Sequence, residues 1–498
     1  MSTGTIPLPR TGAVPLGSRG IRGARRWGAL IILALAQLVV VLDGTIVNIA
    51  LPQAQLALGL TDGQRQWVVT AYALAFGALL LLGGRIADYW GRKRTYMVGM
   101  IGFGAASVFG GLAQNATELI AARGLQGVFA ALLAPAALAL LTVSFPGGKE
   151  RNTAFAVFGT VAGTGAAVGL LLGGVLTEFA DWRWCLLVNV VFVLAGVIGG
   201  FLFLRESRAD GENRYDLAGA LTVTAGLGSL VYGFSLAEYG WARLDTIGFV
   251  VLGVALLVAF VVIESRVAQP LLPLRVITDR VRGGAMLLQA ISGSAMIGGT
   301  VYLAFHLQIV LGFTPLVAGV ASLPMTIVIM LCAPVLTRLL PVIGPRPMMI
   351  VGPLIAAAGL LYLSRITPGG DYFVEVLPGL VLLGLGMANL FIPMQNLALA
   401  RVAPQDAGVA SAAANSAMQI GGSIGLSVFT AFYAAAVATV DVTDGPSQLA
   451  AFTAGYSATF LAAAVVMAAG SVVAFFMIRG TKEHLLPSGD GGPAVHLG

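Results

Sequence analysis

Two residues that can carry charge lie inside long apolar runs of the sequence. Asp43 falls in the run near 28–50, and Arg123 falls in the run near 117–142. A charged side chain at the centre of a membrane helix costs about 2.5–3.5 kcal/mol on insertion scales, so it marks a transport pathway or a pair of opposite charges. At about 1.5 Å per residue from the expected outer helix ends, Asp43 is roughly 12 Å deep and Arg123 roughly 9 Å deep. These depths allow direct or water-bridged contact.

An acid beside an arginine could couple the binding of a proton to transport. In a medium of low dielectric, a carboxylate next to a guanidinium gains or loses its proton according to hydration and to the presence of a cationic ligand. We therefore interpret Asp43 and Arg123 as proton-coupling residues. The alternative is a static ion pair that only fixes helix packing.

The rest of the sequence predicts the helices that would hold this pair. The chain has 498 residues, a mean hydropathy of +0.91 and only 10% charged residues, too few to cover the surface of a soluble protein. Its apolar runs of about twenty residues suit membrane-spanning helices and are too long for β-barrel strands. We predict an all-α polytopic membrane protein with about 14 transmembrane helices, near residues 28–50, 67–84, 95–114, 117–142, 153–178, 184–204, 217–237, 246–264, 283–305, 315–338, 347–364, 374–400, 407–433 and 453–478.

The distribution of basic residues predicts the orientation of these helices. With the N-terminus in the cytoplasm, cytoplasmic segments collect roughly 23 of the 28 Lys and Arg residues, as the positive-inside rule requires. Arg65 then falls in an outer loop. The net charge of +6 follows from this topology, and we expect both termini in the cytoplasm and no nucleic-acid partner.

A repeated motif predicts two bundles of helices. The connection Gly84–Arg94 (GRIADYWGRKR) has a weaker counterpart at 338–346 (RLLPVIGPR), in which Gly344 matches Gly91 and no acid matches Asp88. Parallel repeats of this kind predict two six-helix bundles, 27–205 and 283–480, separated by an insert at 206–282 that contains two helices and cytoplasmic linkers. We expect residues 1–26 to form a basic cytoplasmic tail and 481–498 a disordered cytoplasmic tail.

The first of these connections could lock one conformation of the protein. Asp88 precedes Arg92 by four residues, so the two can pair across one helical turn, and Asp88 could also cap a neighbouring helix. Gly84 and Gly91 allow close packing and a sharp turn. A plain basic loop is the alternative, but it explains neither the acid nor the glycines.

Glycines and amides mark further candidate positions. Gly165, Gly169 and Gly173 share one helix face and would let another helix approach closely; with Gly163 and Gly174 they form a predicted helix-packing hinge, unless they reflect general glycine enrichment. The second bundle has amides suited to hydrogen-bonding a substrate, at Asn389, Asn396, Asn415 and Gln419.

Other ionisable residues receive plainer interpretations. Glu118, Glu178 and Glu264 lie near span ends and are interpreted as solvated, and His306 as an interfacial hydrogen-bonding residue. His484 and His496 lie in the C-terminal tail, and the sequence has neither a cluster of metal ligands nor a phosphate-binding glycine loop. We therefore expect no enzymatic activity, no metal and no cofactor, with a proton gradient rather than ATP as the energy source.

Taken together, these motifs resemble the major facilitator superfamily, and specifically its fourteen-helix drug:proton antiporter branch. The Gly84–Arg94 connection fits the superfamily's loop motif, and Leu42–Pro52 (LDGTIVNIALP) resembles a motif of the branch. The glycine run followed by Trp182–Trp184 and Asn189 is similar to the antiporter motif, although Leu170 and Val191 stand where proline is usual. The resemblance adds four residues to the predicted substrate cavity: Asn48, Trp67, Tyr72 and Gln126.

The resemblance implies an exporter of lipophilic drugs or antibiotics that exchanges them for protons. It would work by alternating access as a monomer in the lipid bilayer of a bacterial cytoplasmic membrane, with neutral, zwitterionic or singly charged substrates. A dedicated exporter of one endogenous metabolite or lipid is the main alternative. A proton-driven importer and a membrane scaffold or sensor without transport are more distant ones.

Overall fold

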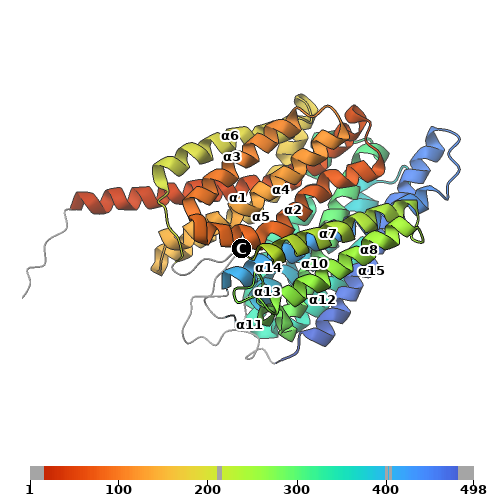
Figure 1. Ribbon diagram of the computed structural model, residues 1–498. Helices are drawn as coiled ribbons and strands as arrows, with labels where there is room; N and C mark the ends of the chain where they lie inside the picture. Colours follow the sequence, from red (N-terminus) through yellow and green to blue (C-terminus); the bar gives the residue numbers. More distant parts are fainter. Residues whose placement is uncertain (1–15, 210–215, 399–401, 403–406, 481–498) are drawn as a thin grey trace, which may run out of the picture.

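The structure, a computed structural model, describes residues 16–209, 216–398, 402 and 407–480. The predicted tail 481–498 and the first fifteen residues of the predicted N-terminal tail lie outside this range. The described residues form no β-strand (Figure 1), and their α-helices are α1 (Leu16–Leu58), α2 (Asp62–Trp90), α3 (Arg92–Gly111), α4 (Ala116–Ser144), α5 (Gly148–Phe179), α6 (Trp184–Phe203), α7 (Leu217–Leu236), α8 (Leu244–Glu264), α9 (Leu274–Thr278), α10 (Arg280–Phe305), α11 (Pro315–Ile343), α12 (Pro345–Leu363), α13 (Leu377–Ala398), α14 (Ala407–Val437) and α15 (Gly445–Met477). Short helical turns occur at η1 (Ala237–Tyr239), η2 (His306–Val310) and η3 (Tyr372–Val376).

The long helices match the predicted membrane spans. Within the described ranges, 13 helices are long and apolar enough to cross a bilayer. The fourteenth long helix is α3, which has 20 residues and packs against α4 and α6; Arg92, Lys93 and Arg94 in its first turn make it more polar than the others. The prediction of an all-α polytopic membrane protein with about 14 spans is confirmed.

Helix α1 differs from its predicted span in length. It begins at Leu16, well before the predicted start near residue 28, and includes 43 residues. A helix of that length extends about 64 Å, which exceeds the thickness of a bilayer. Its start, coloured red, projects beyond the other helices in Figure 1.

The long helices pack in two groups and one pair. Helices α1 to α6 pack on one another, chiefly through α2 with α4, α3 with α4 and α1 with α5. Helices α10 to α15 do the same, chiefly through α12 with α13 and α10 with α14. The groups meet where α2 contacts α14 and where α5 contacts α11; α7 contacts α2 and α14, and α8 packs on α7 (Figure 1).

Close approach of helices depends on glycine in both groups. A Cβ atom on Gly83 of α2 would overlap the backbone of Ala131 in α4, and one on Gly293 of α10 would overlap Met418 in α14. Within a bilayer, lipid tails are as apolar as leucine, so such backbone-to-backbone packing is a main source of helix association.

Candidate functional site

Asp43 of α1 and Arg123 of α4 are in direct contact. Arg123 Nη1 lies 2.5 Å from Asp43 Oδ2, and the exposed fractions of the two side chains are 1% and 0%. The structure thus brings together the two intramembrane charges that the sequence pointed to. Removal of one partner of such a buried pair strongly destabilises the folded protein, because the other charge is then left buried without a counter-ion.

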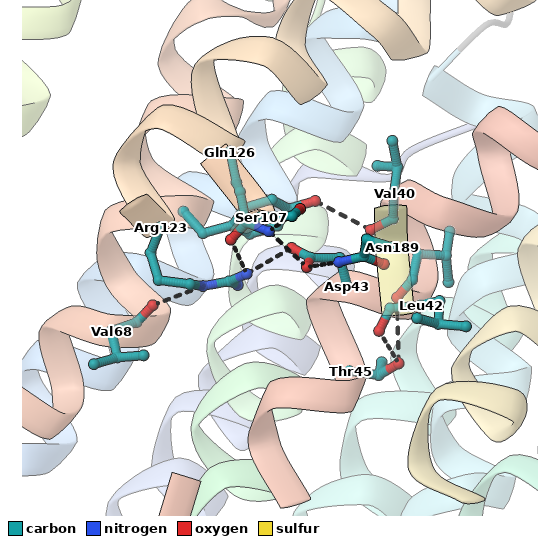
Figure 2. A network of polar contacts seen from close by, with 11 residues as sticks. Val40, Leu42, Asp43, Thr45, Val68, Ser107, Arg123, Gln126 and Asn189 are labelled. Carbon is teal, nitrogen blue, oxygen red and sulfur yellow. Dashed lines mark hydrogen bonds and ion pairs between the residues drawn. The ribbon is translucent and has the colours of Figure 1, made fainter. Parts of the chain in front are cut away.

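Amide side chains from two other positions complete the environment of the carboxylate (Figure 2). Asp43 Oδ1 accepts hydrogen bonds from Asn189 Nδ2 of α6 at 2.7 Å and from Gln126 Nε2 of α4 at 3.0 Å. Gln126 also donates to Ser107 Oγ of α3 at 2.9 Å and accepts from Arg123 Nη1 at 2.9 Å. The carboxylate therefore accepts from three donors on two helices.

The guanidinium of Arg123 is held on its other sides by α2. Its Nε donates to the backbone oxygen of Val68 at 3.1 Å, and its Cζ lies 4.4 Å from the centre of the Tyr72 ring. Tyr72 is fixed in turn by a hydrogen bond from its hydroxyl to the Val40 carbonyl at 3.1 Å. The side chains of this network are buried, and that of Asp43 is 0% exposed.

The α5 glycines serve two different interfaces. Cβ atoms on Gly165, Gly169 and Gly173 would crowd α1, with that of Gly173 only 2.8 Å from the Ile46 carbonyl. Gly174 faces α11 instead, and Gly163 has no neighbouring atom within 4 Å. Four of the five glycines thus permit helix contact, and their role as a hinge stays a prediction.

The Gly84–Arg94 connection has the predicted ion pair. Asp88 Oδ1 accepts from Arg92 Nη2 at 2.7 Å and from Arg92 Nε at 3.1 Å. Gly91 separates α2 from α3 with a φ of 126°, a conformation that favours glycine. A Cβ on Gly84 would make only ordinary contact with Pro135, so packing does not require glycine there. The role of this connection as a lock stays a prediction.

Glu206 also contacts this connection, which the sequence analysis did not predict. Its two oxygens accept from the backbone N–H groups of Lys93 and Arg94 at 3.0 and 3.1 Å, which caps the start of α3. Ser207 and the segment around it add backbone bonds, including Arg92 N–H to the Ser207 carbonyl at 2.9 Å. One indication of this contact is present in the sequence. Glu206 lies just after the predicted span 184–204, on the same predicted side of the membrane as the Gly84–Arg94 connection.

The residues predicted to line a substrate cavity do not form one group. Tyr72 and Gln126 belong to the Asp43 network, and Asn48 is buried on α1. Trp67 faces α7, where its Nε1 donates to Ser235 Oγ at 3.3 Å. The remaining four predicted residues lie on α13 and α14: Asn389, Asn396, Asn415 and Gln419. The three asparagines donate to backbone carbonyls of their own helices, and Gln419 lies beside Gly77 of α2.

Side-chain hydrogen bonds join the two groups of helices at one end of the molecule. We call the end where α1 stops and α2 begins the Thr61 end. There Gln66 Nε2 donates to Ser427 Oγ at 2.6 Å, and Gln308 Nε2 donates to the Ile49 carbonyl at 2.9 Å. Toward the opposite end, Asn396 and Asn415 are exposed. This conformation is thus held shut at the Thr61 end.

Several interpretations of ionisable residues at the span ends were wrong. Glu264, interpreted as solvated, is buried. Glu178 is exposed, as interpreted, and its Oε2 accepts from the Leu316 N–H at 3.0 Å, which joins α5 to α11. His306 is also buried and makes no hydrogen bond to the described residues. Arg65, assigned to an outer loop, lies within α2 and is 2% exposed. Polarity near a span end indicated exposure, but aromatic rings of the other helix group cover Arg65, Tyr456 of the same group packs on His306, and the segment around Leu272 covers Glu264.

Comparison with known families decides the identity of the fold. The profile of the Major Facilitator Superfamily matches residues 33–426, which is most of the chain. The chain belongs to this superfamily. It is therefore a membrane transporter and not an enzyme.

Curated relatives are bacterial resistance and export proteins. The chain is 44% identical over 483 residues to the puromycin resistance protein pur8 of Streptomyces alboniger, with 95% of this chain and 96% of that protein covered. It is 34% identical to the tetracenomycin C resistance and export protein of Streptomyces glaucescens, with 88% and 81% covered. It is 35% identical to the lincomycin resistance protein of Streptomyces lincolnensis, with 82% and 84% covered.

Solved structures agree on the fold. An auto-inhibited peptide transporter of the POT family matches with a TM-score of 0.66 over 93% of this chain and 99% of that chain. The two sequences are 15% identical, so this likeness concerns the fold alone.

Proposed function

We propose that this transporter exports lipophilic antibiotics or related drugs across the bacterial cytoplasmic membrane in exchange for protons. The observation that carries the proton-coupling part is the sealed contact between Asp43 and Arg123, since it is a site whose charge balance one proton would change. The export part is supported by the similarity to resistance and export proteins. Monomeric function and cytoplasmic termini belong to the same proposal, with the Thr61 end facing outward.

Coupling follows from the charge balance of the network. A proton on Asp43 removes the counter-ion of Arg123 and turns one carboxylate oxygen into a donor that must find a new acceptor. Both effects destabilise the packing of α1 against α4, so the protonated and deprotonated forms favour different arrangements of the helices. Exchange with the outer medium then requires that the Thr61 end open, which separates the contacts described above.

The substrate would bind between the two groups of helices, toward the end opposite Thr61. We assign Asn389, Asn396 and Asn415 of α13 and α14 to this site, because their amides can donate and accept hydrogen bonds but cannot ionise. Such a lining suits neutral, zwitterionic or singly charged compounds.

A dedicated exporter of a single compound is the second candidate. Several relatives are named for one antibiotic each, among them puromycin, tetracenomycin C and lincomycin, whereas MdtP of Bacillus subtilis is named a multidrug transporter. A narrow substrate range would follow if the same holds for this chain.

Expression in a bacterium that lacks its main efflux pumps tests the proposal. Inhibitory concentrations are measured for puromycin, lincomycin, tetracenomycin C and unrelated lipophilic dyes, with Asp43→Asn as the matched variant. Raised resistance that Asp43→Asn abolishes supports export; resistance to one compound alone selects the dedicated exporter. An inserted, folded protein that changes no inhibitory concentration contradicts drug export.

A further inference from the structure

Arg65 is a buried cation that joins the two helix groups at the Thr61 end. It belongs to α2, and its guanidinium lies among aromatic side chains of the other group. Its Cζ is 4.3 Å from the ring centre of Phe305, 5.1 Å from that of Tyr433 and 5.6 Å from that of Tyr302. We call these three rings, from α10 and α14, the aromatic cage.

The cage is rigidly built. Each of its three residues is at most 1% exposed. The Tyr302 hydroxyl is hydrogen-bonded to Thr430 Oγ1 at 2.8 Å, and the Tyr433 ring stacks on Tyr456 with 5.5 Å between ring centres. A Cβ on Gly455 would lie 2.5 Å from the Tyr433 ring, so glycine leaves the room that this ring needs. The rings would therefore keep their positions if Arg65 withdrew.

Arg65 is held less completely than its burial suggests. Its Nη1 pairs with Asp62 at 2.9 Å and lies 3.4 Å from Gln55 Oε1, while its Nη2 finds no hydrogen-bond acceptor among the described residues. Gln55 and Asp62 belong to the same helix group as Arg65. If the groups part at this end, both partners travel with Arg65, and only the contact with the rings is lost.

Aromatic faces discriminate among cations. They attract weakly hydrated organic cations such as guanidinium and alkylammonium groups, and bind them most strongly where water is excluded. Strongly hydrated metal ions prefer oxygen ligands instead. A cage that can lose its own guanidinium is therefore suited to a second organic cation.

We propose that the cage of Tyr302, Phe305 and Tyr433 is a binding site for an organic monocation, which Arg65 occupies while the Thr61 end is closed. When that end opens, the positively charged group of an exported compound takes the place of Arg65. Return of Arg65 then displaces the compound and closes the end. This inference rests on the proposed export function and specifies one class of its substrates.

Binding of tritiated benzylguanidinium to the purified protein in lipid nanodiscs tests the site without requiring transport. The head group of this probe copies that of Arg65, and benzylurea is its neutral analogue. Arg65→Ala should bind the probe about tenfold more tightly than wild type, because no tethered cation competes. Adding Tyr433→Leu should remove that gain, and benzylurea should not compete.

Arg183→Ala is the matched control. Arg183 Cζ lies 4.5 Å from the Trp182 ring, but both residues belong to the same helix group, so this variant should bind the probe as wild type does. If Arg65→Ala does not purify, Arg65→Lys replaces it, since its compact, hydrated ammonium fills the cage less well and should give an intermediate gain. Wild-type affinity in the Arg65 variant, or a gain that Tyr433→Leu leaves intact, overturns the proposal.

Export measurements separate this inference from the proposed function. Tyr433→Leu should lower the export of a cationic compound more than that of a neutral one. An equal loss of export for both compounds would mean that the contact of Arg65 with the cage only stabilises the closed end, and would contradict the cation site. Probe binding without export of any compound would instead contradict the export function and leave the site standing.

Discussion

Replacement of Gly169 by alanine tests how closely α1 and α5 must approach to hold Asp43 in place. The added Cβ would overlap Thr45 Oγ1 and lie 3.1 Å from the Leu42 carbonyl. The Thr45 hydroxyl cannot easily turn away, because it is bonded to the Leu42 carbonyl at 3.0 Å and to the Val41 carbonyl at 3.2 Å. Helices α1 and α5 must therefore separate.

The expected cost of Gly169→Ala is that of overpacking, about 1–3 kcal/mol. Gly163→Ala, on the same helix, is the matched control, because its Cβ would meet no atom within 4 Å and alanine favours a helix by up to about 1 kcal/mol. Thr45→Ala in the Gly169→Ala background removes the overlapping hydroxyl and should restore part of the stability.

Thermal unfolding in detergent, followed by tryptophan fluorescence, measures these differences. Gly169→Ala should unfold at a lower temperature than wild type, and Gly163→Ala at the same temperature or higher. Equal unfolding temperatures for the two variants would refute the assignment of this seam. Because the seam borders Asp43, Gly169→Ala should also reduce export at constant protein level.

Three further predictions concern the charged contacts. Arg123→Leu leaves Asp43 without its counter-ion and should cost about 3–5 kcal/mol in unfolding experiments, but less when combined with Asp43→Asn; strictly additive costs would contradict their coupling. Asp88→Ala removes the pair with Arg92 and should shift cysteine labelling between the two membrane faces, whereas unchanged labelling would exclude a lock. Glu206→Ala uncaps α3 and should lower stability by about 0.5–2 kcal/mol; an unchanged unfolding temperature would show that the cap is dispensable.

Sequence alone was sufficient for the spans and for the central pair. Runs of about twenty apolar residues leave few alternatives to a membrane helix, and a charge within such a run demands a partner at similar depth. Asp43 and Arg123 satisfied both conditions, so their contact could be expected even though 80 residues separate them in the chain.

The partners of these residues could not be predicted in the same way. Asn189 and Ser107 are uncharged, and their presence in a span costs too little to signal a role. Arg65 was misassigned because its distance from a span end gave no information on the aromatic residues of the other helix group that cover it. Glu206 lies outside the spans, where an acid usually indicates only exposure. The surroundings of each of these residues are set by contacts between segments far apart in the sequence, which the local sequence pattern does not show.

Proton movement in inverted membrane vesicles tests the central claim most directly. The vesicles are acidified inside, an antibiotic from the resistance panel is added, and internal pH and antibiotic uptake are followed together for wild type and Asp43→Asn at equal protein levels. Exchange of protons for drug predicts antibiotic-dependent alkalinisation with uptake in wild type, and neither in the variant. Uphill uptake that persists in Asp43→Asn would contradict the account.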